Sequence, residues 1–324
     1  MTRKVDVDPR SPYDNVERLA TVEMRAHNML QGYIPRLYAI VRGENPITYD
    51  ISREFLGMRN ARVAIVTGIV VEKLLPKGEV DGPVGAAVLG RALSRLGHDV
   101  DILVEKEMDD VVASLIETLG FEGSIVHTTD RSPEDLARWA DDYDVAVTIE
   151  KLGRNREGVR HSVMGSPLAK SGDYYIDDFI EAMNEKGKLT VGIGDGGNEI
   201  GFGKIYDHVR GMVAFGADCG CPCGGGTATT TATGYLFPAA ISNYGAYALT
   251  TALALGASDG DLLVDGETVR ELVEACVSRG CLDGGTVKPD FIGDDGVPID
   301  AVMRYVDQLG SIFAQWMSTF DRDF

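Results

Sequence analysis

Short apolar segments alternate with amphipathic segments along most of the chain. The apolar runs 62–70, 100–105, 124–129, 144–150, 189–194 and 235–241 predict strands. The segments 81–97, 109–120, 132–141, 176–186 and 244–256 lie between or after these runs and predict helices. Strands that alternate with helices are typical of a mostly parallel sheet covered on both faces. The sequence therefore predicts a three-layer α/β/α fold of the Rossmann-like kind.

Both ends of the chain are predicted to be helical. Between residues 15 and 43, apolar residues recur mostly at steps of three and four, which predicts one or two helices before the first strand. Further helices are expected at 265–279 and 298–320. No repeat or obvious linker interrupts the chain. We therefore expect a single α/β domain over residues 1–324, in which a helical extension, residues 1–60, packs on a core formed by residues 61–324.

Composition limits the partners of the protein. Its 50 Asp and Glu residues against 31 Lys and Arg residues give a formal net charge of -19, and the acids are spread along the chain. Such a charge disfavours nucleic acids and anionic membranes as partners. No apolar run approaches the roughly 20 residues of a membrane span, and the first residues lack the apolar segment of a signal peptide. The chain also has five cysteines, an odd number that fits a reducing compartment. These features predict a cytoplasmic protein that acts on a small molecule. They are compatible with a homo-oligomer.

Polar residues and glycines follow four of the predicted strands. Ligands of open parallel sheets bind beyond the carboxyl ends of the strands, so these residues are expected to meet at one edge. In chain order they are Thr67, Gly68, Glu79, Asp81 and Gly82 after the first strand, Glu150 and Arg154 after the fourth, Asp195, Asn198 and Glu199 after the fifth, and Ser242 and Asn243 after the sixth. The convergence of four loops predicts a functional site at this edge.

The segment GIGDGGNEIGFG, residues 192–203, contains a GxGxxG pattern but argues against a nucleotide site. A dinucleotide loop opens a long helix, whereas only a short turn and further glycines follow here. Asp195 lies inside the loop, where its charge would repel a pyrophosphate unless a metal intervened. One alternative is a glycine-rich turn in which Asp195 and Asn198 cap a short helix. The other is a substrate site, where backbone N–H groups reach an oxyanion while Asp195 and Glu199 attract an ammonium group or a divalent ion.

The run CGCPC, residues 219–223, raises the question of a metal. On an extended segment, alternate cysteines point to one side and offer soft ligands to zinc or another thiophilic ion. The neighbouring glycines and Pro222 instead favour a bent loop, and structural zinc sites usually contain CxxC pairs. We therefore expect packed or redox-inert thiols, so that replacing Cys219, Cys221 and Cys223 changes stability or loop order more than turnover. A metal stays an alternative, with a fourth ligand from Cys276 or Cys281 only if the fold delivers one.

Three further side chains are weaker candidates. His161 could act as a base, although a loop histidine is more often solvated. Arg154, four residues after a strand end, could clamp a carboxylate. Ser242 lies in AAISNYG rather than in a GxSxG elbow, which disfavours a serine hydrolase and favours a helix cap.

Four segments together resemble the D-glutamate cyclase family. They are GEVDGPVGA at 78–86, EKLGR at 150–154 with Glu157 and Gly158 after it, GIGDGGNEIG at 192–201, and SNYGAYAL at 242–249. The resemblance covers about residues 62–256. It implies conversion of D-glutamate to 5-oxo-D-proline and water, a lyase reaction that needs no ATP. The chain departs from the family pattern in the segment RHSVMGSP at 160–167, in Tyr244 where Trp is usual, and in Phe202 where Met is common.

The implied chemistry assigns roles to the residues at the strand ends. Lactam formation needs a base for the ammonium, donors for the developing oxyanion, and an acid for the leaving oxygen. Asp195 and Glu199 suit the first task, while Asp81 or Glu150, held protonated by a neighbouring carboxylate, suits the last. The expected substrate-binding residues are Arg154, as anchor of the α-carboxylate, together with Gly194, Gly196, Gly197, Asn198, Ser242, Asn243, Thr67, Gly68 and Gly82.

Cofactors and alternative functions stay open. The acids could instead hold Mg²⁺ or Mn²⁺, which would polarise the carboxyl group of the substrate. No nucleotide is expected. A hydrolase or dehydratase that acts on another small amino acid or lactam is an alternative function, and so is a non-enzymatic protein that binds a small molecule or a metal.

Overall fold

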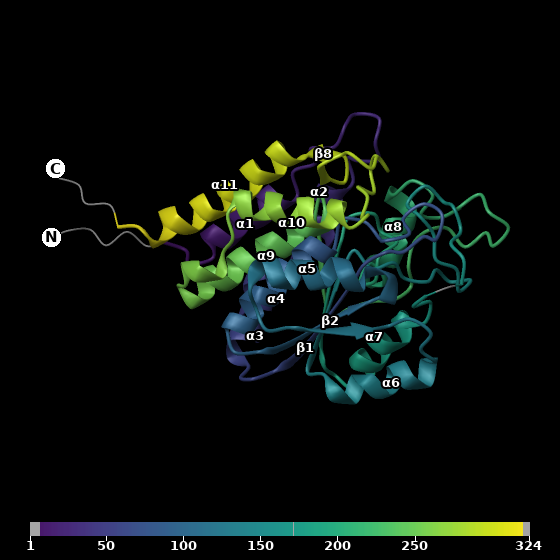
Figure 1. Ribbon diagram of the computed structural model, residues 1–324, viewed down its shortest axis with the longest axis horizontal. Coiled ribbons are helices and arrows are strands. Elements are labelled where there is room, and N and C mark those ends of the chain that lie inside the picture. Colours follow the sequence, from purple (N-terminus) through teal and green to yellow (C-terminus); the bar gives the residue numbers. More distant parts are fainter. Residues whose placement is uncertain (1–6, 171, 320–324) are drawn as a thin grey trace.

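The computed structural model describes residues 7–170 and 172–319. Its centre is a six-stranded sheet with the order β3-β2-β1-β4-β5-β6, in which every neighbouring pair is parallel. The strands are β1 (Arg62–Thr67), β2 (Asp99–Val104), β3 (Ser124–His127), β4 (Val145–Ile149), β5 (Leu189–Gly194) and β6 (Tyr235–Pro238). Helices lie on both faces of this sheet, so the predicted three-layer α/β/α fold is confirmed (Figure 1).

The two helical layers differ in size. One face of the sheet carries α6 (Pro133–Asp142) and α7 (Ile176–Glu185). The other carries the larger layer, made of α1 (Ser11–Ala20), α3 (Ile47–Gly57), α4 (Pro83–Arg95), α5 (Asp109–Leu119), α9 (Ser242–Ala257), α10 (Gly266–Ser278) and α11 (Ile299–Met317). The remaining elements are α2 (Ile34–Val41), α8 (Tyr206–Met212), the 3-10 turns η1 (Lys106–Met108), η2 (Gly203–Ile205) and η3 (Gly260–Leu262), and the hairpin β7 (Gly293–Asp294) and β8 (Val297–Pro298). Across the described residues, no helix combines the length and apolarity of a membrane span.

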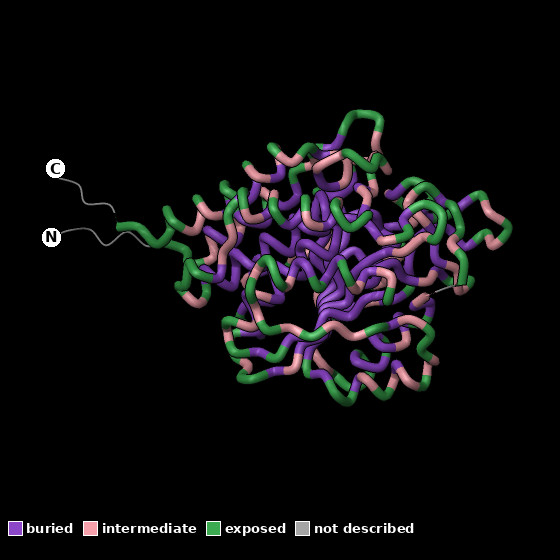
Figure 2. The backbone as a smooth tube through the Cα atoms, viewed as in Figure 1, coloured by how far each residue is buried: buried purple, intermediate pink, exposed green. Residues whose placement is uncertain are grey.

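Alternate residues of β1 face opposite layers. Val63 and Ile65 belong to the core shared with α4 and α9, whereas Ala64 and Val66 belong to the core shared with α6 and α7. All four side chains are fully buried, and Figure 2 shows the buried backbone concentrated in the sheet and the helices next to it. A strand that is covered on both faces has to be apolar at nearly every position, which is why the apolar runs located the strands well.

The strand order creates a crevice between β1 and β4. From β1 the chain proceeds outward through β2 to β3, and from β4 it proceeds in the opposite direction through β5 to β6. The loops after β1 and β4 therefore diverge, which leaves room for a ligand at the carboxyl ends of these two strands.

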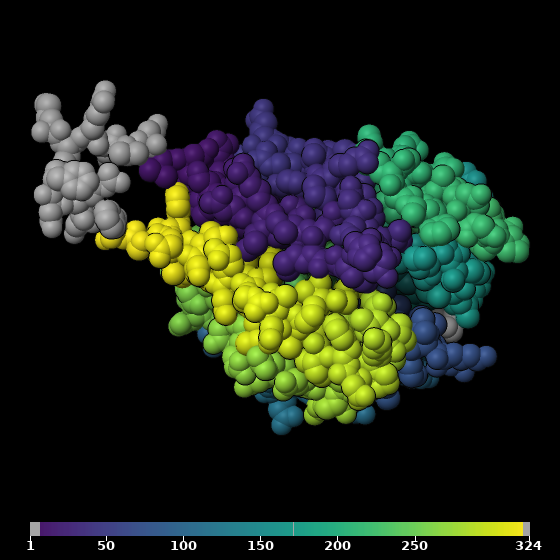
Figure 3. Space-filling view, turned by 90° about the horizontal axis from the view of Figure 1, so that it is seen from above, coloured from purple at the N-terminus to yellow at the C-terminus, as the bar shows by residue number. Residues whose placement is uncertain are grey.

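The N-terminal region forms three helices: α1 and α2 overlap the range 15–43, where one or two helices were predicted, and α3 was not predicted. Pro35 lies in the first turn of α2 and Pro46 precedes α3, and proline cannot continue a helix from the preceding turn. The stretch between α1 and α2 is consequently irregular. The helices α1 and α3 join the large core around α9, and the N-terminal segment lies beside the C-terminal helices in the space-filling view (Figure 3).

Glu17 of α1 connects the three N-terminal helices. Its buried carboxylate accepts hydrogen bonds from the Tyr38 hydroxyl of α2 and from the backbone N–H and the hydroxyl of Thr48 in α3, the last at 2.8 Å. Burial outweighs these donors and raises the pKa of Glu17 to about 7. Below pH 4.5 the side chain is protonated in both the folded and the unfolded chain. Between about pH 4.5 and pH 7 only the unfolded chain loses this proton, so stability falls over this window and the full cost of burying the charge is reached above about pH 7.

We predict that Glu17→Gln flattens the pH dependence of stability. Between pH 5 and pH 8 the wild type should lose up to roughly 3 kcal/mol more unfolding free energy than the variant, because glutamine mimics the protonated acid. Urea denaturation at several pH values measures this difference. The matched change Glu117→Gln, at an exposed position of α5, should leave the wild-type profile unchanged. Parallel profiles for the wild type and Glu17→Gln would show that the prediction is wrong.

Candidate active site

Three carboxylates meet at the crevice between β1 and β4. Asp81 comes from the loop after β1, Glu150 directly follows β4, and Asp195 directly follows β5. One oxygen from each lies within 4.8 Å of the others, and the three residues are 3%, 8% and 7% exposed. The structure therefore brings together three of the acids expected at this edge, in a group that could hold a divalent cation or an ammonium group.

Asp81 links the loop after β1 to the start of α9. Its carboxylate accepts the backbone N–H groups of Ser242, at 3.1 Å, and Asn243, at 2.7 Å, and so satisfies two donors of the first turn of that helix. Burial and the neighbouring carboxylates Asp294 and Asp195 nevertheless raise the pKa of Asp81 well above its usual range. Asp81 thus holds the wall of the site in place while it contributes to the acidic group.

Glu150 occupies an unusual backbone conformation. Its φ of 48° lies in the left-handed region, which costs a residue with a side chain on the order of 1–3 kcal/mol and is most common at functional sites. The Ser242 hydroxyl donates to its carboxylate at 2.5 Å. Burial, followed by the charges of Asp195 and Glu199, raises the pKa of Glu150 well above its usual range. A protonated Glu150 is therefore available as a proton donor.

Asp195 forms an ion pair with Arg25, from the irregular segment between α1 and α2. The same guanidinium also pairs with Asp295, and its own side chain is only 5% exposed. Burial raises the pKa of Asp195 well above its usual range, and the charge of Arg25 acts in the opposite direction. Arg25 thus partly compensates two carboxylates and attaches the N-terminal segment to the site.

Further acids surround this group. Asp294 of β7 accepts a hydrogen bond from the Asn243 side chain at 2.9 Å, and burial raises its pKa to about 8. Burial also raises the pKa of Glu79, which lies nearby on the loop after β1. The sequence did not identify four residues at this site, because none of them follows a predicted strand. They are Asp294, Asp295, Arg25 and Tyr33. The acidic and glycine-rich stretch 283–296 was the available signal for the first two.

The acids of this site described above, except Asp294, line a pocket of about 370 Å³. Its acidic side is formed by Glu79, Asp81, Glu150, Asp195, Glu199 and Asp295, with Asn198, Arg25 and Tyr33, and its apolar walls include Met29, Leu30, Leu74, Leu75, Val163 and Met164. This volume lies near the lower end of the range for small-molecule sites. The pocket therefore suits a small ligand that carries a positive charge or that donates hydrogen bonds to the carboxylates.

The glycine-rich loop after β5 is closed by its own glutamate. The Glu199 carboxylate accepts the backbone N–H groups of Asp195, Gly196 and Gly197 at 3.2, 2.6 and 2.7 Å. Both N–H groups are thus occupied by Glu199, and this geometry gives no support to the expectation that Gly196 and Gly197 bind an oxyanion. For the same reason Glu199 is better described as the residue that shapes the loop than as a base.

Asn243 is also occupied by the fold. Its side-chain oxygen accepts the N–H groups of Gly82 and Gly85 at 3.0 and 2.6 Å, and its amide nitrogen donates to Val80 and Asp294. Asn243 does not line the acidic pocket, so the structure does not place it where the expected contact with substrate would occur. Asn198 does line the pocket; its amide nitrogen donates to the His161 carbonyl at 2.9 Å, and its side-chain oxygen has no hydrogen-bond partner among the described residues.

Arg154 lies away from the pocket. Its guanidinium pairs with Asp177 and Asp178 of α7 at 3.4 and 2.7 Å, and it lies over the ring of Tyr174. It does not line the acidic pocket. The structure therefore does not place Arg154 at the pocket where the expected anchor of a substrate carboxylate would lie, and Arg25 is the one Lys or Arg residue among the described residues that line this pocket.

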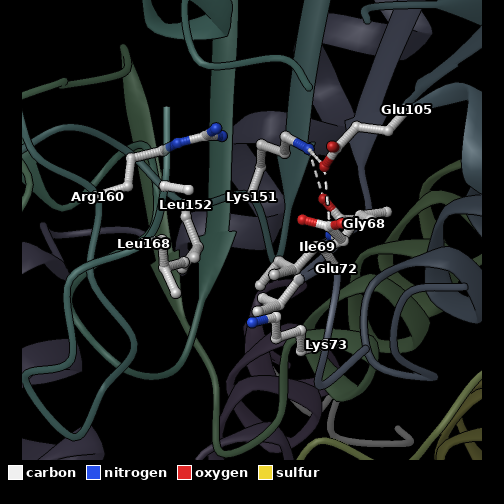
Figure 4. A pocket seen from close by; sticks show the side chains of 12 residues that line it. Gly68, Ile69, Glu72, Lys73, Glu105, Lys151, Leu152, Arg160 and Leu168 are labelled. Atoms are coloured by element: carbon white, nitrogen blue, oxygen red, sulfur yellow. Dashed lines mark hydrogen bonds and ion pairs between the residues drawn. The ribbon is translucent and has the colours of Figure 1, made fainter. Parts of the chain in front are cut away.

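A second pocket of about 340 Å³ shares Ile69, Val71, Leu152 and Leu168 with the first. Figure 4 shows the residues that line this second pocket. Its polar side contains Lys151, which pairs with Asp173 and, at 3.7 Å, with Glu105, and which donates to the Gly68 carbonyl. Gly68 thus lines the second pocket rather than the acidic one.

Four other residues that were predicted to bind substrate take part in the packing around the site. Thr67, Gly82, Gly194 and Ser242 do not line the acidic pocket. At Gly82, where φ is 97°, an added Cβ would lie 2.5 Å from the Thr67 hydroxyl and 3.0 Å from Glu150 Cβ. At Gly194 it would lie 2.8 Å from the Phe202 ring. These residues allow close packing around Glu150 and the loop after β5, and the expectation that they contact the substrate is not met.

The fold and the site define an α/β protein with a buried acidic pocket at the switch point of a parallel sheet. Residues 45–310 match the family model described as D-glutamate cyclase-like, C-terminal, and the chain belongs to this family. The chain is 29% identical over 223 residues to the mitochondrial D-glutamate cyclase of Homo sapiens. This match covers 63% of the chain and 34% of the human protein, so the chain spans about a third of that relative.

Solved structures resemble the chain only distantly. A ketoreductase of actinorhodin polyketide synthesis covers 79% of this chain and 94% of its own at 16% identity, with a TM-score of 0.29. A short-chain dehydrogenase/reductase from Serratia marcescens covers 41% of this chain and 55% of its own at 16% identity, with a TM-score of 0.25. Such scores carry no inference about ligands.

We predict that NAD, ATP and GTP do not bind tightly. Glu199 occupies the backbone N–H groups that would cradle a phosphate, and the pocket beyond them carries an excess of carboxylates. Isothermal titration calorimetry measures the affinities. A micromolar dissociation constant for any of the three would contradict this assignment of the glycine-rich loop.

We also predict that Arg25→Met is strongly destabilising. Removing the guanidinium leaves Asp195 and Asp295 without their shared cation, and breaking a buried pair in this way typically costs about 3–5 kcal/mol. The loss should shrink when Asp195→Asn is added, because one of the two carboxylates is then removed. Urea denaturation of the single and double variants measures both effects. Arg138→Met, which removes an exposed pair with Asp135, is the control, and equal losses for Arg25→Met and Arg138→Met would overturn the prediction.

Proposed function

We propose that the protein is a lyase that closes a small acidic amino acid into its lactam and converts D-glutamate to 5-oxo-D-proline and water. The observation that carries this proposal is the meeting of buried Asp81, Glu150 and Asp195 in one pocket with Arg25. Membership of the D-glutamate cyclase-like family supports the reaction class.

Charge is the first argument for an amino-acid substrate. The pocket holds more carboxylates than cations, so an α-ammonium group is attracted to it. Arg25, which lies on the same side of the pocket, is the group that the α-carboxylate of the substrate would approach. The apolar side chains of Met29 and Leu75 would then border the methylene groups of the substrate.

Proton transfer is the second argument. Asp195, which is paired with Arg25, accepts a proton from the ammonium. Burial raises its pKa, which strengthens its carboxylate as a base, while the Arg25 charge opposes this rise. The free amine attacks the γ-carboxyl carbon, and a protonated Glu150 gives its proton to the oxygen that leaves.

The proton balance closes without a nucleotide. The nitrogen forms one bond to the γ-carbon while a carbon–oxygen bond breaks, and two of the three ammonium protons end in the water that departs. Asp195 takes one of these protons and passes it to the departing oxygen, and the second restores Glu150 after Glu150 has donated its own proton to the same oxygen. No phosphorylated intermediate is needed, which agrees with the occupied N–H groups of the glycine-rich loop.

The same carboxylates offer a second way to activate the substrate. Asp81, Glu150 and Asp195 present oxygen ligands of the kind that Mg²⁺ and Mn²⁺ prefer, and such an ion would polarise the γ-carboxyl group. An assay with chelator and with each ion therefore belongs to the test. The cytoplasmic location stays a prediction, since the mitochondrial designation is that of the human relative.

The proposal predicts lactam from D-glutamate without ATP. Asp195→Asn and Glu150→Gln should each lower the rate by on the order of 100-fold to 10,000-fold, because each change removes a proton-transfer group while it keeps the size of the side chain. Chiral chromatography of reactions with D- and L-glutamate, with EDTA, Mg²⁺ or Mn²⁺, measures product and enantiomer preference.

The matched control is Asp130→Asn, an acid with an 81% exposed side chain outside both pockets, which should retain the wild-type rate. Circular dichroism and thermal melting establish that each variant is folded. Wild-type turnover in Asp195→Asn would remove this residue from the mechanism, and no lactam from either enantiomer under any metal condition would overturn the proposed reaction.

A further inference from the structure

Four soft ligand atoms meet outside the acidic pocket. The sulfurs of Cys219, Cys221 and Cys223 are 3.3 to 3.5 Å apart, and His161 Nε2 lies 3.4 Å from the Cys221 sulfur and 3.6 Å from the Cys223 sulfur. All four atoms lie within 4.8 Å of one another. They come from two loops that are about 60 residues apart in the sequence.

We propose that these four residues bind one zinc ion in a tetrahedral Cys₃His site. Zinc–sulfur bonds of about 2.3 Å and zinc–nitrogen bonds of about 2.0–2.1 Å place neighbouring ligands roughly 3.6–3.8 Å apart around a tetrahedron. The observed spacings are within a few tenths of an ångström of this value, so the ligands need only small shifts to receive the ion. Three thiolates and an imidazole are also the donors that select zinc over Mg²⁺ or Ca²⁺.

The shape of the cysteine loop explains why the sulfurs converge. In an extended strand, alternate side chains are about 6.6 Å apart along the chain. Here Gly220 and Gly224 have φ values of 69° and 64°, which residues with side chains rarely adopt, and they curl the loop around its sulfurs. The bent loop predicted from the glycines is thus present, but it favours a metal site. The expectation of merely packed thiols is replaced by this proposal.

The fourth ligand is a histidine rather than another cysteine. Cys276 and Cys281 belong to the large core, where the Cys281 thiol donates to the Lys77 carbonyl. His161 was considered only as a base in the sequence, because nothing there indicated that its ring would lie against the cysteine loop.

Neighbouring N–H groups support thiolates at this position. The Asn155 side chain and the Gly225 backbone N–H lie 3.5 and 3.4 Å from the Cys223 sulfur and donate to it. Asn155 also donates to the Gly226 carbonyl at 2.7 Å, so it ties the two ligand-bearing loops together. Such outer contacts orient the ligands of metal sites. Cys221 and Cys223 are partly exposed, which gives an ion a path from solvent.

The site is placed to hold one wall of the acidic pocket. His161 is followed directly by Ser162, Val163 and Met164, which line that pocket, and its carbonyl accepts the Asn198 amide. None of the four ligands lines the acidic pocket. The ion would therefore attach the segment around His161 to the 219–226 loop, and its role is structural and independent of the proposed reaction.

Metal analysis of the purified full chain tests the proposal. We expect one zinc ion per chain after dialysis, loss of that zinc in Cys221→Ser/Cys223→Ser, and its retention in the control Cys276→Ala. Stripping the wild type with a strong chelator should lower the melting temperature, and Zn²⁺ but not Mg²⁺ should restore it. That selectivity separates this site from the carboxylate group.

Cobalt substitution keeps the test independent of how the cysteine variants fold. Co²⁺ added to the stripped wild type should give the absorption of a tetrahedral cobalt–thiolate site, and His161→Ala should alter its visible bands. Substoichiometric zinc in wild type reconstituted with Zn²⁺, iron in its place, a disulfide between two of the three cysteines, or zinc retained by the double cysteine variant would each overturn the proposal.

Discussion

The burial of several carboxylates within one small volume is the constraint on which the site depends. Like charges in a medium of low polarity raise each other's pKa, and they can be accommodated only by sharing protons, by nearby cations or by N–H donors. All three solutions occur here. Raised pKa values favour protonated forms of Glu79, Glu150 and Asp294, Arg25 pairs with two aspartates, and backbone N–H groups bind Asp81 and Glu199.

These interactions divide the acids into two groups with different roles. Asp81 and Glu199 use their oxygens to fix a helix start and a loop, so they are part of the framework. Glu150 and Asp195 contact mainly single side-chain partners, Ser242 and Arg25, and remain able to exchange protons with a ligand. An acid and a base with different surroundings at one edge of a sheet are the arrangement that general acid–base chemistry requires. The framework acids support that difference, because they fix the loop and the helix start that surround the other two.

The sequence predicted the sheet and the three central acids because both follow from local rules. Strands covered on both faces are apolar throughout, and residues after parallel strands share an edge, so Asp81, Glu150 and Asp195 could be expected together. Arg25, Asp294 and Asp295 could not, because Arg25 lies on an irregular segment and the two aspartates lie in the short β7–β8 hairpin, and the positions of both depend on tertiary packing. Arg154 is the opposite case: it was predicted at the site because it follows a strand, but its guanidinium pairs with Asp177 and Asp178 of α7 outside the pocket. Which polar atoms are already satisfied, as at Asn243 and Gly197, is likewise a property of the folded chain alone.

The glycine-rich loop has the sequence pattern of a nucleotide-binding loop but a different arrangement of charges. In a nucleotide-binding protein, the N–H groups of such a loop stay free for phosphate, and a long helix adds its positive end. Here the carboxylate of Glu199 sits where the loop would otherwise receive an anion, and Asp195 extends toward Arg25 and the pocket. The chain thus satisfies these donors with its own carboxylate. The next negative charge, on Asp195, then repels anions and attracts cations. The fold therefore keeps the geometry of a switch-point site while the side chains reverse its electrostatic preference, and this reversal is an argument for the proposed ammonium-bearing substrate.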